Sequence, residues 1–198
     1  EGVSPKEIVD KYHNLMSKTF KEFGIEFSHY GRTSAPIHHK TSADFFKYLY
    51  DKGVFQEIET EQYFDEKANS FLADRYIIGT CPKCANDRAY GDQCERCGTS
   101  LSPQELIHPH SALSGEKPVL KKTKHWFLPM DHIQNSPEFK EYIPRLDQWK
   151  SNIKGQVNSW LNEGLKPRSM TRDLDWGVKV PIPGAENKVL YVWFDAPI

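Results

Sequence analysis

Two Cys-x-x-Cys pairs lie close together in the sequence, and their spacing constrains the fold more than any other feature. The cysteines are Cys81, Cys84, Cys94 and Cys97, with nine residues between the two pairs. Two residues between paired cysteines let both sulfurs point inward from one tight turn, and two facing turns supply the four thiolates of a tetrahedral zinc site. Gly98 follows the second pair and can adopt the positive φ that such a turn favours, whereas Ala85 takes the matching place after the first. The pattern predicts one structural Zn²⁺.

Two other interpretations of the four cysteines remain open. Two disulfides are possible, with three connectivities, but a chain of 198 residues with 38% hydrophobic residues can bury a core without covalent cross-links. A thioredoxin-like redox site uses a single Cys-x-x-Cys and leaves the second pair unexplained. We favour zinc. Because a closed site of four cysteines has no position for water, such a metal would stabilise the fold and take no part in catalysis.

The charge composition does not indicate a highly charged binding partner such as nucleic acid. Charged residues make up 27% of the chain and the formal net charge is −1, which argues against a surface built wholly for nucleic acid. A local basic group at Lys117, Lys121, Lys122 and Lys124 is better explained as the solvated face of a strand. The sequence has neither a run of about 18 apolar residues nor a cleavable signal pattern, so we expect a cytoplasmic protein without membrane contact.

The first fifty residues are typical of an α/β unit. Ser4 begins a capping box with Pro5 at the first helical position, and apolar residues at helical spacing predict a helix that ends at Gly24. Residues 25–30 are expected to form a short strand, and Thr41 or Ser42 to cap a second helix that ends at Gly53. A helix, a strand and a helix in this order indicate an α/β fold class.

The pattern changes to short strands after residue 53. Strands are expected at 54–61, 71–78 and 118–128, which together predict a small β-rich lobe around the zinc turns. Ser136 then opens a helical stretch with an apolar stripe that we expect to be core. The stripe consists of Phe139, Tyr142, Ile143, Leu146, Trp149, Ile153, Val157, Trp160 and Leu161. A final apolar run at 189–194 predicts a buried strand, and because a natural domain rarely ends just after such a strand, we expect the chain to be an excised fragment.

Several strings in the sequence are long, ordered and correctly spaced around the cysteines. They are FLADRYIIGTCPKC at 71–84, YGDQCERCG at 90–98, TRD at 171–173 and YVWFDAPI at 191–198. These strings resemble the methionyl-tRNA synthetases, a family of class I aminoacyl-tRNA synthetases, over essentially the whole chain. The resemblance implies a split Rossmann-like catalytic domain with an inserted zinc-knuckle lobe and return helices.

That resemblance also implies a division of the chain and a function. Residues 1–53 resemble the end of the first catalytic half, 54–180 the connective insertion, and 181–198 the start of the second half. The full-length enzyme would use ATP, Mg²⁺, methionine and tRNA(Met) as a methionine–tRNA ligase. The HIGH and KMSKS motifs that bind ATP in this family are absent from the sequence, so we expect the fragment alone to be inactive.

Individual residue roles follow from the resemblance at a few positions. Trp193 corresponds to the residue whose indole lines the methionine pocket, although a buried core tryptophan on a strand is the alternative. Arg172 and Asp173 fall in a segment that borders the active site, where an exposed ion pair would explain them equally well. Some relatives carry a tryptophan where this chain has Arg168, which puts a stacking role at that position in doubt.

The resemblance and the sequence together support a single metal ion. Some relatives have another Cys-x-x-Cys pair where Phe64 and Lys67 stand here. The histidine pairs His38-His39 and His108-x-His110 have no nearby thiols, so we interpret them as loop histidines without metal.

Two functions from other classes remain as alternatives. A zinc-ribbon nucleic-acid-binding module would need a basic face and stacking aromatics beside the cysteines, where only Arg88 and Tyr90 are available. A zinc-stabilised interaction module would have no pocket. The complete reading frame, with or without the two ATP-binding motifs, would discriminate between these and the ligase.

Overall fold

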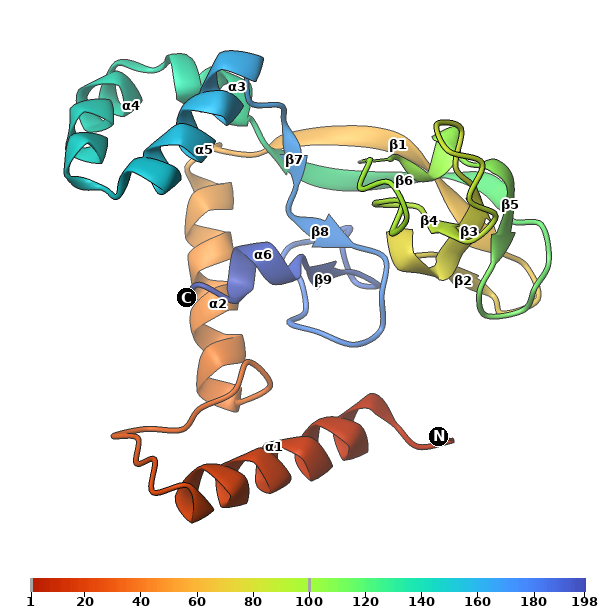
Figure 1. The fold of residues 1–198 in the computed structure, drawn as a ribbon, viewed down its shortest axis with the longest axis horizontal. Helices are drawn as coiled ribbons and strands as arrows, with labels where there is room; N and C mark the ends of the chain where they lie inside the picture. The colour runs from red at the N-terminus through yellow and green to blue at the C-terminus, as the bar shows by residue number, and fades with distance from the viewer. Residues whose placement is uncertain (1, 100) are drawn as a thin grey trace.

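A long antiparallel ribbon organises the computed structural model, which describes residues 2–99 and 101–198 (Figure 1). Strand β1 (Gln56–Asp65) pairs along nearly its whole length with β6 (Val119–Leu128), and the two strands fall at the segments 54–61 and 118–128 where strands were expected. Two short strands, β2 (Ser70–Phe71) and β7 (Arg168–Ser169), extend it to a sheet of order β2-β1-β6-β7. The ribbon carries the zinc lobe at one end and helices at the other.

The lysines of the ribbon lie beside glutamates. Lys122 Nζ is 3.0 Å from Glu59 and Lys124 Nζ is 2.6 Å from Glu57, each on the neighbouring strand. Both glutamates raise the pKa of the lysine they contact. This face is therefore a solvated strand surface with paired charges, as predicted.

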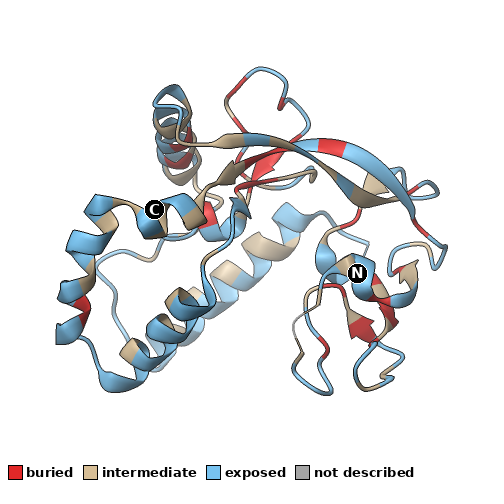
Figure 2. Cartoon of the chain, turned by 90° about the horizontal axis from the view of Figure 1, so that it is seen from above, coloured by how far each residue is buried: buried red, intermediate tan, exposed pale blue. Residues whose placement is uncertain are grey.

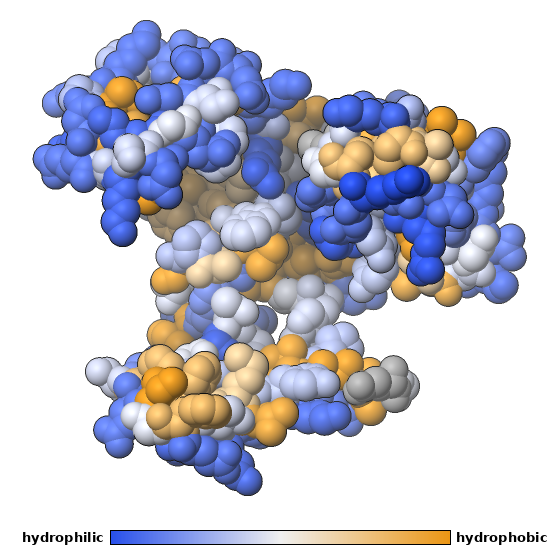
Figure 3. Space-filling view, viewed as in Figure 1, coloured by the Kyte–Doolittle hydropathy of each residue, from blue (hydrophilic) through white to orange (hydrophobic). Residues whose placement is uncertain are grey.

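The N-terminal part consists of helices α1 (Pro5–Glu22) and α2 (Pro36–Asp51). The capping box is confirmed: Ser4 Oγ accepts from the Glu7 backbone N–H at 3.3 Å, and Glu7 accepts from the Ser4 backbone N–H at 2.8 Å. Helix α1 lies apart from the rest of the chain in Figure 1 and has no buried residue. Apolar surface is accordingly visible over this region in Figure 3.

Two expectations for this part are wrong. Residues 25–30 form no strand, because their rings pack back on α1: Phe27 lies 5.1 Å from Phe20, and Tyr30 stacks on His13 at 4.8 Å between centroids. Helix α2 begins at Pro36 and not after Thr41 or Ser42, because proline has the helical φ already fixed at the first position. His38 and His39 consequently lie on a helix and not in a loop.

The zinc lobe is a three-stranded antiparallel sheet with β3 (Ile77–Thr80) between β4 (Ala89–Tyr90) and β5 (Ile107–Ser111). The expected strand at 71–78 is interrupted by a 3₁₀ turn, η1 (Asp74–Tyr76), where the chain leaves the ribbon and enters the lobe. A second 3₁₀ turn, η2 (Pro103–Glu105), precedes β5. The lobe core is small: Leu72, Ile77, Ala89, Leu106 and the sulfurs of Cys81 and Cys94.

The helical region consists of four elements, of which the first precedes the stretch predicted to open at Ser136. They are α3 (Met130–Asn135), α4 (Pro137–Tyr142), the 3₁₀ helix η3 (Ile143–Gln148) and α5 (Ser151–Glu163). Ser136 caps α4 as predicted. The expectation that the apolar stripe is core is wrong for Tyr142, Trp149, Ile153 and Trp160, which are exposed, because these helices meet no opposing layer within the described chain (Figure 2).

The main core lies between α2, the ribbon and the C-terminal segment. Phe46 and Trp126 pack there with residues of 170–194, and β8 (Thr171–Arg172) pairs with β9 (Val189–Leu190). The predicted strand at 189–194 is correct only for its first two residues. Beyond them the chain turns into helix α6 (Val192–Asp195), because Phe194 rotates inward to contact Phe46 at 5.6 Å between centroids.

Candidate functional site

The four cysteines converge at the tip of the zinc lobe. Cys81 follows β3 directly, and both turns have the same backbone hydrogen bond. The N–H of Ala85 donates to the carbonyl of Cys81 at 3.0 Å, and the N–H of Gly98 donates to the carbonyl of Cys94 at 2.8 Å. Gly98 has φ 70°, as predicted, and Ala85 has φ 57°, the left-handed region that an L-residue with a side chain disfavours. The two turns are thus near copies, with the strain concentrated at Ala85.

The sulfur positions fit a tetrahedral metal site. All four Sγ atoms lie within 4.8 Å of one another, with Cys81 and Cys97 at 3.9 Å and Cys84 and Cys94 at 3.6 Å. A Zn–S bond of about 2.3 Å in tetrahedral geometry places the sulfurs about 3.8 Å apart. The cysteines are free thiols, and these separations far exceed the roughly 2.05 Å of a disulfide. The disulfide interpretation is therefore wrong.

The surroundings of the sulfurs favour negative charge at some of them and oppose it at others. Burial raises the pKa of Cys94, but N–H donors from Cys97 and from the Asn86 side chain outweigh it and lower that pKa to about 6. Backbone hydrogen bonding at Asn86 lowers the pKa of Cys84, yet burial and the neighbouring thiols raise it to about 12. Four thiolates repel one another at these distances, so a bound cation is the natural source of compensating charge.

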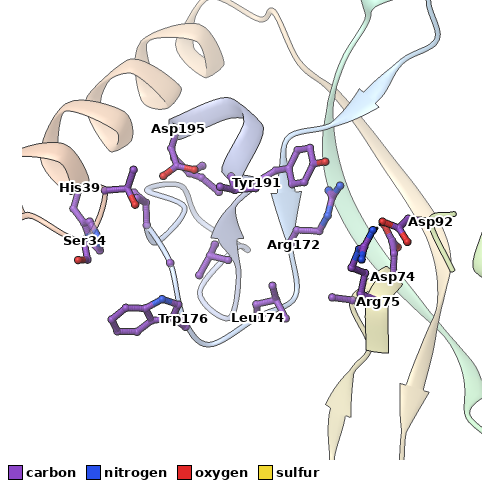
Figure 4. Close-up of a pocket in the computed structure, with 17 residues that line it drawn as sticks. Ser34, His39, Asp74, Arg75, Asp92, Arg172, Leu174, Trp176, Tyr191 and Asp195 are labelled. Atoms are coloured by element: carbon purple, nitrogen blue, oxygen red, sulfur yellow. Dashed lines mark hydrogen bonds and ion pairs between the residues drawn. The ribbon is translucent and has the colours of Figure 1, made fainter. Parts of the chain in front are cut away.

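A pocket of about 370 Å³ opens between the zinc lobe, the start of α2 and the C-terminal segment (Figure 4). Asp74, Arg75 and Asp92 come from the zinc lobe. The opposite side is formed by β8, β9 and the residues around them, which contribute Arg172, Leu174, Trp176, Leu190, Tyr191 and Asp195. Thr33, Ser34 and His39 complete the lining from the N-terminal part. Three segments far apart in sequence therefore share one cavity.

The charged groups in this pocket are only partly solvated. Burial raises the pKa of Asp74 and lowers that of Arg172, and each of the two opposes the shift of the other through its charge. Arg75 bonds to Asp92 at 2.9 Å and to Glu95 at 3.1 Å, so it is held within the zinc lobe. The pocket can accordingly hold a small ligand that carries both apolar and ionic groups.

Helix α6 is fixed against α2 by a partly buried pair. His38 Nε2 lies 3.1 Å from Asp195 Oδ2, and the Ser42 hydroxyl lies 3.3 Å from the same ring nitrogen. Because Asp195 lines the pocket, this contact joins the N-terminal part to the site.

Trp193 lies on α6 between residues that line the pocket, but it is not one of the lining residues itself. Its side chain is 70% exposed, so it is not the core tryptophan of the alternative interpretation. Its role in a methionine pocket stays a prediction.

Arg172 and Asp173 face different surroundings. Arg172 lines the pocket, whereas Asp173 forms a buried polar group with Lys188, Thr123 and His125, whose Nε2 lies 3.0 Å from the carboxylate. The alternative explanation, an exposed ion pair between Arg172 and Asp173, is therefore wrong, because Asp173 pairs with His125 and Lys188. Asp74, Arg75, Asp92 and Tyr191 were not predicted as site residues, although all four lie within the strings that carry the resemblance.

Solved structures share this fold. A Mycobacterium tuberculosis methionyl-tRNA synthetase in complex with methionyl-adenylate superimposes with a TM-score of 0.61, at 15% identity, over 98% of this chain and 33% of that one. The apo form of the same enzyme superimposes with a TM-score of 0.56, over 99% of this chain and 34% of that one. The chain therefore has the α/β fold class of the matching region of those structures.

Sequence comparison narrows this class further. The family model of the class I tRNA synthetases (M) matches residues 1–198, and the chain belongs to that family. It is similar to methionine–tRNA ligases of Cytophaga hutchinsonii (62% identical), Parabacteroides distasonis (58%) and Flavobacterium johnsoniae (57%), in each case over 100% of this chain. It spans 29%, 29% and 28% of the lengths of those proteins.

Among the described residues, no helix is both long and apolar enough to cross a membrane.

Proposed function

We propose that this chain is part of a cytoplasmic methionine–tRNA ligase, which activates methionine with ATP and transfers it to tRNA(Met). The observation that carries the proposal is the 62% identity, over the whole chain, to a protein described as methionine–tRNA ligase. In this assignment residues 1–53 end the first catalytic half, 54–180 form the connective insertion and 181–198 begin the second half.

The pocket between the zinc lobe and β8–β9 is the part of the active site that this chain supplies. Its ionic residues, Arg172 and Asp74, suit the charged groups of an amino acid or nucleotide, and Leu190 and Val192 supply apolar surface. Trp193 lies on the same helix as Val192 and Asp195, which line the pocket, and we assign its indole to the wall that contacts the methionine thioether in the full-length enzyme. ATP and Mg²⁺ would be held mainly by motifs that the chain does not contain.

Cys81, Cys84, Cys94 and Cys97 would hold one Zn²⁺, which when bound ties the two turns of the lobe together. The cysteines leave no open position, so the metal's role here is structural. The sulfur separations of 3.6 and 3.9 Å support this assignment, as does their common approach to one point.

The test is methionine-dependent exchange of pyrophosphate into ATP by the full-length protein that carries this chain. We expect exchange with methionine, charging of tRNA(Met), and one equivalent of zinc after purification without chelator. Residues 1–198 alone should give no exchange. Activity with another amino acid only, or zero or two equivalents of zinc, would contradict the assignment.

A further inference from the structure

The ring of Tyr191 contacts two arginines, one inside the pocket and one outside it. The Cζ atom of Arg172 lies 3.8 Å from the ring centroid, and that of Arg168 lies 5.4 Å from it. Arg168 Nη2 also donates a hydrogen bond to the Tyr191 hydroxyl at 3.1 Å. Figure 4 shows Arg172 reaching from β8 toward the zinc-lobe side of the pocket, with the Tyr191 ring beside it. The three side chains form a continuous group.

Arg172 depends on this ring for its orientation. Its guanidinium donates hydrogen bonds to backbone carbonyls of its own segment, at Ser169 (3.1 Å) and Thr171 (2.8 Å). Burial disfavours its charged form, and no carboxylate of the described residues lies within 4 Å of its guanidinium as an ion pair. The face of an aromatic ring attracts a cation and also restricts where the planar guanidinium lies. Moving the ring would therefore move the charge.

Arg168 contacts the pocket wall through the Tyr191 side chain, and its charge also acts on Asp74 and Arg172. It is exposed, it is not among the lining residues, and its backbone is held in β7 opposite Leu128. The Tyr191 backbone is fixed independently, by its N–H bond to Met170 at 2.9 Å. Arg168 thus acts on the orientation of the phenol ring, while the course of the chain at Tyr191 is set elsewhere.

We propose that Arg168 is a positioning residue for the methionine-activating site, which holds the Tyr191 ring so that Arg172 keeps its place in the pocket wall. The inference rests on the proposed function. Arg168 does not line the pocket, so it would act on methionine binding by holding the Tyr191 hydroxyl. Removing Arg168 and removing that hydroxyl should therefore change the methionine kinetics in the same way.

A double-mutant cycle in the full-length protein tests this, with methionine-dependent pyrophosphate exchange as the assay. Arg168→Ala and Tyr191→Phe should each lower kcat/KM for methionine about fivefold, chiefly by raising KM, because the pocket is misaligned and not dismantled. The double variant should be no more than about twofold worse than either single variant, since both remove one interaction. Arg168→Lys, which keeps a donor for the hydroxyl, should recover part of the loss.

Arg145→Ala is the matched control. Arg145 is also an exposed arginine beside a tyrosine, with its Cζ 5.5 Å from the Tyr142 ring, but it lies on η3 outside the pocket lining. Its removal should leave the kinetics unchanged. The inference is overturned if the two effects multiply in the double variant, if Arg168→Ala behaves as wild type, or if ATP and methionine kinetics fall equally together with the melting temperature. An active wild type with a multiplicative cycle refutes this inference alone, whereas a wild type without methionine-dependent exchange refutes the proposed function and this inference with it.

Discussion

Replacing Ala85 by glycine should stabilise the zinc lobe, although the change removes a methyl group. Ala85 has φ 57°, and the left-handed region costs a residue with a Cβ about 1–2 kcal/mol relative to glycine. Part of this gain is offset because glycine has more freedom in the unfolded chain, by about 0.5–1 kcal/mol. The net expectation is roughly 1 kcal/mol in favour of the closed turn, which is about a fivefold change in the opening equilibrium.

Gly98→Ala provides the reverse change at the equivalent position of the second turn. Gly98 has φ 70°, and a Cβ built there meets no atom within 4 Å, so any cost is conformational and not steric. We expect the opening equilibrium of the second zinc turn to rise about fivefold in this variant. The pair therefore tests backbone strain alone, in two turns with the same hydrogen bonds.

Amide hydrogen exchange of the metal-loaded protein measures these differences locally. The backbone N–H groups of residues 81, 85, 94 and 98 should exchange more slowly in Ala85→Gly and faster in Gly98→Ala, while amides of α2 stay unchanged. If Ala85→Gly exchanged faster than wild type, the strain argument would be wrong. If neither variant changed exchange, the metal would dominate the lobe so strongly that turn geometry is irrelevant to its opening.

Further predictions concern the metal, one buried carboxylate and the methionine site. Cys94→Ser should reduce bound zinc well below one equivalent. Because metal binding and lobe folding are linked, amide exchange in 71–99 should accelerate before that of α2. Unchanged exchange in 71–99 would refute the structural role of the metal. Hydrogen bonds from Ser111, Ser114 and nearby backbone N–H groups lower the pKa of Asp65 to about 2. Since the unfolded pKa is about 3.9, this stabilisation is complete above that pH and is lost as the pH falls from about 4 to about 2. Asp65→Asn should abolish that step in urea midpoints measured against pH, and its persistence would assign the step to another group. Trp193→Ala in the full-length protein should lower kcat/KM for methionine at least about a hundredfold, for a loss of roughly 3–5 kcal/mol, with the KM for ATP within a few-fold; equal loss for both substrates would contradict the role.

Local signals predicted the elements that depend on neighbouring residues. The capping box at Ser4 located the start of α1, and the short-strand pattern bounded by turn residues located β6, because both patterns are satisfied within a few residues. The four cysteines were brought together as predicted, since their ligand spacing is itself a local geometric constraint. The wrong predictions concern segments whose conformation is set by contacts with distant residues. Residues 25–30 have the composition of a strand, but their rings pack on helix α1.

The pocket was harder to predict because its lining comes from three parts of the chain. Nothing local at Asp74 or Tyr191 indicates that they share a cavity with Ser34. The run at 189–194 was expected to be a single strand because apolar residues follow one another without interruption. Tertiary packing of Phe194 on Phe46 bent it into α6, and this bend is what leaves Trp193 exposed.

The zinc turns and the pocket are connected through a backbone contact between the loop before Cys94 and Asp74. Gly91, three residues before Cys94, donates its backbone N–H to the carbonyls of Asp74 and Ile77, both at 3.1 Å. A Cβ at Gly91 would lie only 2.6 Å from the Asp74 carbonyl oxygen, so the two backbones are in direct contact. The loop that carries the second cysteine pair therefore rests on the residue whose carboxylate lines the pocket. A metal that orders this loop, though it takes no part in chemistry, would thereby fix one wall of the site.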